Sequence, residues 1–145
     1  MKLNLLYLKT GGGHFSTAKS IAEQFQKSYG NEVESILIDG LDQAPKAVKK
    51  MIEEGYSLST DKAPLLWKSL YAMSMLKSVN KIERGAFSLL VKKHIREQIY
   101  KDKPDKIIIL HFLLIKPVMD VLKEEKLKIP TLIVTTDPFT PPQIW

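Results

Sequence analysis

A run of three glycines and a histidine follows a short apolar stretch near the start of the chain. The stretch is Leu3 to Leu8, and the turn is Gly11-Gly12-Gly13-His14. Glycines let a backbone pass close to a ligand, and a helix that starts there offers N–H groups and a positive dipole end to an anion. The turn is not a P-loop, and Ser16 replaces the third glycine of a dinucleotide fingerprint. The glycine turn therefore predicts that backbone N–H groups at this position bind a phosphate.

His14 is the residue of this turn that can exchange a proton near neutral pH. At the start of a helix, the dipole disfavours the imidazolium form, so we expect a lowered pKa for His14. A neutral imidazole can act as a general base. The alternative is a turn histidine that only forms local hydrogen bonds.

Three more polar residues follow predicted strands, namely Asp39, His111 and Asp137. Ligands of open α/β sheets bind beyond the carboxyl ends of the strands, so we expect these residues to line one rim with His14. Asp137 is suited either to orient or charge-balance His14 or to cap the turn before Pro138. The alternative for the whole set is that loops at strand ends are simply polar.

The elements that must position these residues alternate along the chain. Short apolar runs predict strands at 3–8, 33–38, 106–110 and 131–135. Helical spacing predicts helices at 15–29 (with Gly30 as the C-terminal cap), 43–59, 65–79, 81–101 and 115–125. This order predicts a Rossmann-like α/β fold, a parallel sheet flanked by helices, in one domain over residues 1–145.

Composition narrows the classes of partner. The formal charge of +6 over 145 residues favours anionic partners. The chain lacks a nucleic-acid recognition motif, so we expect no nucleic-acid partner. With no cysteine and three histidines in distant segments, we expect no metal site, and the composition fits a reducing compartment. The apolar runs fall short of the roughly 20 residues that a membrane-spanning helix needs.

An apolar helix beside a basic one is predicted in the middle of the chain. Residues 64–76 are apolar nearly all round. The following helix carries a set of basic residues: Lys92, Lys93, Arg96, Lys101 and Lys103. Such a pair suits a surface that touches anionic lipid. The alternative is two core helices whose lysines extend to solvent.

The motifs, taken in order, resemble the monogalactosyldiacylglycerol synthase and processive diacylglycerol glucosyltransferase family, which is related to the glycosyltransferase that makes lipid II. The resemblance covers essentially the whole chain. Its motifs are Gly11-Gly12-Gly13-His14 with Ser16 and Ala18, Pro104-Asp105 leading to His111-Phe112, and Val134-Thr135-Thr136-Asp137 followed by Trp145.

The resemblance implies the N-terminal, acceptor-side half of a GT-B architecture, with the C-terminal donor-binding domain absent from this chain. It implies a hexosyltransferase that moves a sugar from a UDP-sugar to diacylglycerol or a related lipid, by inversion and without cofactor or metal. It also implies that these 145 residues alone would not catalyse the sugar transfer. The implied location is cytoplasmic, peripheral at the inner face of the cell membrane, with lipid acceptor and anionic membrane as partners.

Residue by residue, the resemblance implies His14 as the base on the acceptor hydroxyl, Asp137 as a second catalytic residue and Gly11–Gly13 near the donor diphosphate. Contacts with the acceptor or membrane are expected from Trp67, Leu70, Tyr71, Met73, Phe139 and Trp145. Two departures are Pro142, where members often have histidine, and Phe112, where many have proline after the histidine. The alternative function is a non-catalytic Rossmann-like domain that binds a membrane surface or ligand.

Overall fold

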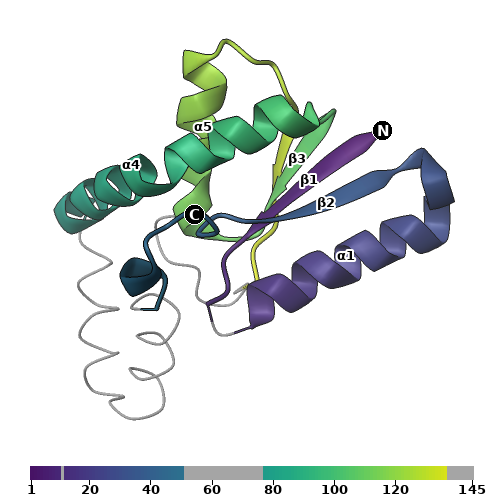
Figure 1. Cartoon of the computed structure of the whole chain (residues 1–145), viewed down its shortest axis with the longest axis horizontal. Helices are drawn as coiled ribbons and strands as arrows, with labels where there is room; N and C mark the ends of the chain where they lie inside the picture. Colours follow the sequence, from purple (N-terminus) through teal and green to yellow (C-terminus); the bar gives the residue numbers. More distant parts are fainter. Residues whose placement is uncertain (11, 51–76, 137–145) are drawn as a thin grey trace.

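The computed structural model describes residues 1–10, 12–50 and 77–136 (Figure 1). Within them lies a parallel sheet of order β2-β1-β3-β4. Its strands are β1 (Lys2–Tyr7), β2 (Glu34–Asp39), β3 (Lys106–Ile109) and β4 (Thr131–Ile133). The helices are α1 (Gly13–Tyr29), α4 (Lys77–Asp102) and α5 (Ile115–Glu124), with short 3-10 turns η1 (Gly30–Glu32) and η2 (Phe112–Leu114). The predicted Rossmann-like α/β fold is confirmed.

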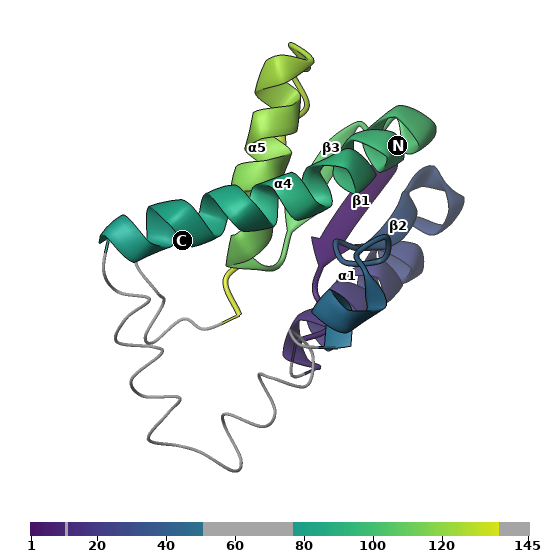
Figure 2. The same cartoon turned by 60° about the vertical axis from the view of Figure 1, so that its left-hand side comes forward.

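Helices lie on both faces of the sheet. Figures 1 and 2 show α1 on one face and α4 with α5 on the other. Successive side chains of a strand point to opposite faces, so β1 supplies both layers. Leu3 and Leu5 pack in the cluster that contains Ala18 of α1, whereas Leu6 packs in the cluster that contains Ile95 of α4. The sheet is therefore buried from both sides, as parallel sheets generally are.

The strand order reverses at β1. The connection through α1 leads from β1 to β2 on one side, and the later strands β3 and β4 add on the other side. In an open α/β sheet, this reversal leaves a crevice beyond the carboxyl ends of the two strands that flank it. Here those strands are β1 and β3, so the fold directs attention to the residues that follow them.

Two glycines delimit α1 as its sequence predicts. Gly12 precedes the helix with φ of 79°, a left-handed conformation that glycine adopts at little cost. Gly30 follows it with φ of 54°, and its N–H donates to the carbonyl of Gln26. The prediction of Gly30 as the C-terminal cap is confirmed, and the helix begins two residues before the predicted start.

Two predicted helix boundaries were wrong. The predicted break at Asn80 is absent, because α4 runs unbroken from Lys77 to Asp102. Asparagine disfavours a helix only mildly, and the packing of Ile95 and Ile99 against the sheet stabilises a long helix. The helix expected from Gln43 starts at residue 46 instead. Residues 41–43 form a turn, which is closed by a hydrogen bond from the N–H of Ala44 to the carbonyl of Leu41.

Candidate functional site

Two histidines meet beyond the carboxyl ends of β1 and β3. His14 is the second residue of α1, and His111 lies two residues beyond the end of β3. Their ring centroids are 4.4 Å apart, with the ring planes inclined at 56°. Of the three rim residues that the structure describes, His14, Asp39 and His111, the two histidines are in direct contact.

The ring of His14 is held by its Nδ1 atom. Nδ1 lies 2.5 Å from the carbonyl oxygen of Leu110 and 3.2 Å from Oγ1 of Thr136. A carbonyl oxygen can only accept a hydrogen bond, so Nδ1 carries the proton and donates it. In a neutral imidazole the other nitrogen, Nε2, then carries the lone pair. This arrangement gives His14 a proton-accepting atom.

The carbonyl that orients His14 belongs to the sheet. The N–H of Leu110 donates to the carbonyl of Leu6 on β1 at 2.9 Å, and the N–H of Val134 donates to the carbonyl of Ile109 at 2.9 Å. The backbone at Leu110 is thus held between β1 and the segment after β4, and its side chain is fully buried. An acceptor fixed in this way constrains the ring of His14 more firmly than a mobile side chain would.

His111 is buried, with 4% of its surface exposed. Its Nδ1 accepts the N–H of Leu113 at 3.2 Å, which caps η2, and its ring stacks on Phe112 with centroids 4.6 Å apart. Burial lowers the pKa of His111 well below 6.5, and the neighbouring His14 lowers it further. His111 is therefore an uncharged ring at neutral pH.

The glycines at the start of α1 have room around their Cα atoms. A Cβ atom placed on Gly12 or Gly13 would meet no atom within 4 Å beyond the adjacent residues and the backbone of the helix itself. The hydroxyls of Ser16 and Thr17 both donate to the carbonyl of Gly13, at 3.0 and 2.9 Å, and no acidic residue lies in the first turn. The first-turn N–H groups of a helix point along its axis away from the helix body. This end of α1 can therefore approach an anion without repulsion from a nearby carboxylate of its own turn.

Asp39 ends β2, but its carboxylate is used within the protein. Oδ1 accepts the N–H of Leu41 at 3.0 Å, and Oδ2 lies 3.5 Å from Nζ of Lys49 and 3.9 Å from Nζ of Lys9. Beneath it, Nε2 of His94 lies 3.1 Å from the Asp39 carbonyl oxygen. These contacts shape the turn after β2, and a role of Asp39 in binding stays a prediction.

Part of the predicted basic surface is paired with carboxylates. Arg96 on α4 contacts Glu124, the last residue of α5, and Glu125, the C-cap of that helix, with N–O distances of 2.9 and 2.7 Å. Lys92 pairs with Glu124, and Lys93 lies 3.9 Å from Glu97. Such ion pairs do not test contact with anionic lipid, so that role of the helix stays a prediction. Within the described ranges, no helix is both long enough and apolar enough to cross a bilayer.

Several predicted site residues lie outside the described residues, so their roles stay predictions. They are Gly11, Trp67, Leu70, Tyr71, Met73, Asp137, Phe139 and Trp145. Two contributors to the site were missed at the level of sequence. The Leu110 carbonyl is a backbone group and has no sequence signal. Thr136 is part of the quoted motif before Asp137, and that motif was the signal that could have identified it.

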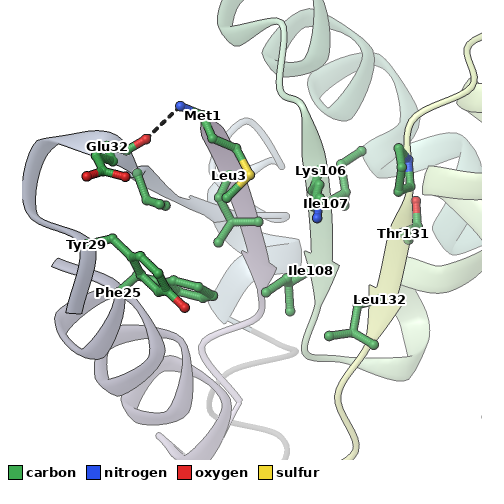
Figure 3. A pocket seen from close by; sticks show the side chains of 12 residues that line it. Met1, Leu3, Phe25, Tyr29, Glu32, Lys106, Ile107, Ile108, Thr131 and Leu132 are labelled. Carbon is green, nitrogen blue, oxygen red and sulfur yellow. Dashed lines mark hydrogen bonds between the residues drawn. The ribbon is translucent and has the colours of Figure 1, made fainter. Parts of the chain in front are cut away.

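A groove of about 590 Å³ lies at the opposite edge of the sheet (Figure 3). Met1, Leu3, Lys106 and Thr131 line it, all at or near the amino ends of strands, and the amino group of Met1 donates to the Glu32 carbonyl at 2.7 Å. Ligands of open α/β sheets bind at the other edge. The candidate site is therefore at the carboxyl ends of β1 and β3, where His14 and His111 meet.

Comparison with known proteins identifies the family of the chain. A family model described as monogalactosyldiacylglycerol (MGDG) synthase matches residues 14–145. The chain is 27% identical over 154 residues to "Monogalactosyldiacylglycerol synthase 1, chloroplastic" of Arabidopsis thaliana, covering 99% of this chain and 27% of that protein. It is 24% identical over 143 residues to the chloroplastic monogalactosyldiacylglycerol synthase of Spinacia oleracea, covering 97% of this chain and 27% of that protein. The chain thus spans about a quarter of the length of these relatives. Because the family model matches the chain from His14 to its last residue, the chain belongs to the monogalactosyldiacylglycerol synthase family.

Proposed function

We propose that this domain is the acceptor side of a lipid glycosyltransferase and that His14 is its general base. The observation that supports the proposal is the hydrogen bond between Nδ1 of His14 and the Leu110 carbonyl. That bond leaves Nε2 as the proton-accepting atom at the carboxyl edge of the sheet, where α/β enzymes hold their substrates. The names of the matched family and relatives support the reaction class.

The proposed step is a single displacement. A hydroxyl of diacylglycerol or a related lipid gives its proton to Nε2 of His14 while its oxygen attacks the anomeric carbon of a UDP-sugar. The bond from that carbon to the diphosphate breaks, UDP leaves with the electron pair, and the configuration of the sugar inverts. The Nδ1–H bond to Leu110 persists throughout and supports the imidazolium that forms.

The donor diphosphate is proposed to lie near the glycine turn. The start of α1 supports this, because it combines a positive dipole end with open space at Gly12 and Gly13. We place the rest of the donor site in a second domain of a GT-B architecture. The relatives support this, since the matched region is 27% of their length. We propose that the protein acts at the inner face of the cell membrane, where a lipid acceptor is available.

The test is transfer of sugar from a UDP-sugar to diacylglycerol in vesicles by the full-length polypeptide carrying this sequence. His14→Ala should lower kcat by roughly 100- to 10,000-fold, the range typical for loss of a general base. Gln24→Ala is the matched control, because Gln24 is an exposed residue of the same helix that bonds to Ser28. Undiminished transfer by the His14→Ala variant would remove His14 from the mechanism.

A further inference from the structure

The proposed step makes no use of His111, although its ring lies against that of the base. The two centroids are 4.4 Å apart, and His111 is 4% exposed. A buried polar side chain is costly unless its hydrogen-bonding groups are used. The cap of η2 uses Nδ1 of His111, whereas the face of its ring lies against His14, and that contact has no part in the cap.

We propose that His111 is a positioning residue for His14. Its uncharged ring supports one side of the His14 ring, and together with the Leu110 carbonyl it keeps His14 in the form that has hydrogen on Nδ1 and the lone pair on Nε2. The proposal rests on the proposed role of His14 as the base and deepens it.

The backbone contact of His111 defines its own form. Nδ1 accepts the N–H of Leu113 at 3.2 Å, so in the neutral ring the hydrogen is on Nε2. A proton added to Nδ1 of His111 would point at the N–H of Leu113. Two donors would then face each other, and the hydrogen bond that caps η2 would be lost. Geometry therefore opposes a charged His111, in the same direction as burial, which lowers its pKa.

An uncharged neighbour matters to the base. A cation this close would repel a proton arriving at His14, whereas a neutral aromatic ring tolerates an imidazolium beside it. Apart from burial, the group that acts on the pKa of His111 within the described part of the chain is His14 itself. Phe112 stacks on the other side of the His111 ring, and Asp137 lies outside the described residues.

Two substitutions distinguish the contact of the His111 ring with His14 from the hydrogen bond by which His111 caps η2. His111→Asn keeps an acceptor for the Leu113 N–H and removes the ring. His111→Phe keeps a ring against His14 and removes the acceptor. Nitrogen-15 NMR of the labelled chain reports the tautomer of His14 directly. We expect His14 to keep hydrogen on Nδ1 in the Phe variant, and to show a mixture of both tautomers in the Asn variant.

The same variants in the full-length polypeptide give a kinetic readout. His111→Asn should lower kcat about tenfold with little change in KM, while His111→Phe should stay closer to the unsubstituted protein. A purely structural role predicts parallel losses in both variants. His14 resonances that are the same in both variants as in the unsubstituted chain would overturn the proposal.

Should either variant fail to fold, the unsubstituted chain still tests the idea. A pH titration followed by nitrogen-15 NMR should show His111 neutral, with hydrogen on Nε2, while His14 gains its proton. A His111 that becomes charged first would overturn the inference. Because NMR needs no turnover, this result is independent of the proposed function. Undiminished sugar transfer by the His14→Ala variant would contradict the role of His14 as the base. A His111 that becomes charged before His14 would contradict only the role of His111.

Discussion

Nδ1 of His14 lies 2.5 Å from the carbonyl oxygen of Leu110, a residue 96 positions later in the chain. The contact joins the start of α1 to the end of β3 across the point where the strand order reverses. It assigns the Nδ1 proton and thereby identifies Nε2 as the accepting atom.

Thr136 should tune the base without being essential. Its Oγ1 lies 3.2 Å from Nδ1 of His14 and shares the N–H that Leu110 accepts. Thr136→Val removes the oxygen at similar volume, so we expect kcat/KM for lipid glycosylation to fall roughly three- to tenfold, the equivalent of one modest hydrogen bond. Thr136→Ser retains the hydroxyl and should retain most of the activity. Full activity in Thr136→Val with a loss in Thr136→Ser would show that the methyl group, and not the hydrogen bond, matters.

The pKa of His111 predicts a pH dependence of stability. Burial lowers this pKa well below 6.5 in the folded protein, whereas the unfolded chain has an ordinary histidine. Below about pH 6.5 the unfolded state binds a proton that the folded state does not, so the free energy of unfolding falls as the pH falls. The contribution is at most about 1.4 kcal/mol per pH unit. Urea unfolding between pH 7.5 and 5 should therefore show a smaller loss for His111→Asn than for the unsubstituted chain. Identical slopes would contradict a neutral buried His111.

Gly40 should tolerate no larger side chain. A Cβ at this position would collide with the side chain of Leu114 and lie 3.1 Å from Cδ2 of Leu8. Both leucines are fully buried, so Gly40→Ala should destabilise the protein by about 1–3 kcal/mol in denaturant unfolding.

Gly85 offers the matched control for Gly40. It lies within α4, and a Cβ there would have no other atom within 4 Å. Gly85→Ala should raise the free energy of unfolding by roughly 0.5–1 kcal/mol, because alanine favours a helix over glycine. A loss of stability in Gly85→Ala would contradict the open surroundings of this position.

Arg96 should stabilise the packing of α4 on α5. Its guanidinium contacts the carboxylates of Glu124 and Glu125, with its side chain about one-third exposed. We expect Arg96→Ala to lower the free energy of unfolding by about 1 kcal/mol, with a smaller effect in high salt. Lys93→Ala is the control, since Lys93 is 83% exposed and its pair with Glu97 is 3.9 Å long. Equal effects of the two substitutions would show that the contacts with α5 contribute nothing specific.

The sequence by itself determined the class of fold and the position of the base candidate. Alternating strand and helix patterns dictate a parallel sheet, because each crossover returns the chain in the same direction. The glycine turn predicts where α1 begins, since local backbone geometry depends on nearby residues. His14 at that start was therefore accessible from sequence alone.

Tertiary structure decided what surrounds His14. A pattern of strands and helices does not specify which strands are neighbours, and only the order β2-β1-β3-β4 brings the Leu110 carbonyl and the ring of His111 to His14. The continuity of α4 past Asn80 likewise depends on the packing of this helix against the sheet. The physical reason is common to both. Local patterns encode periodicity, whereas contacts between residues almost a hundred positions apart exist only once the layers have assembled.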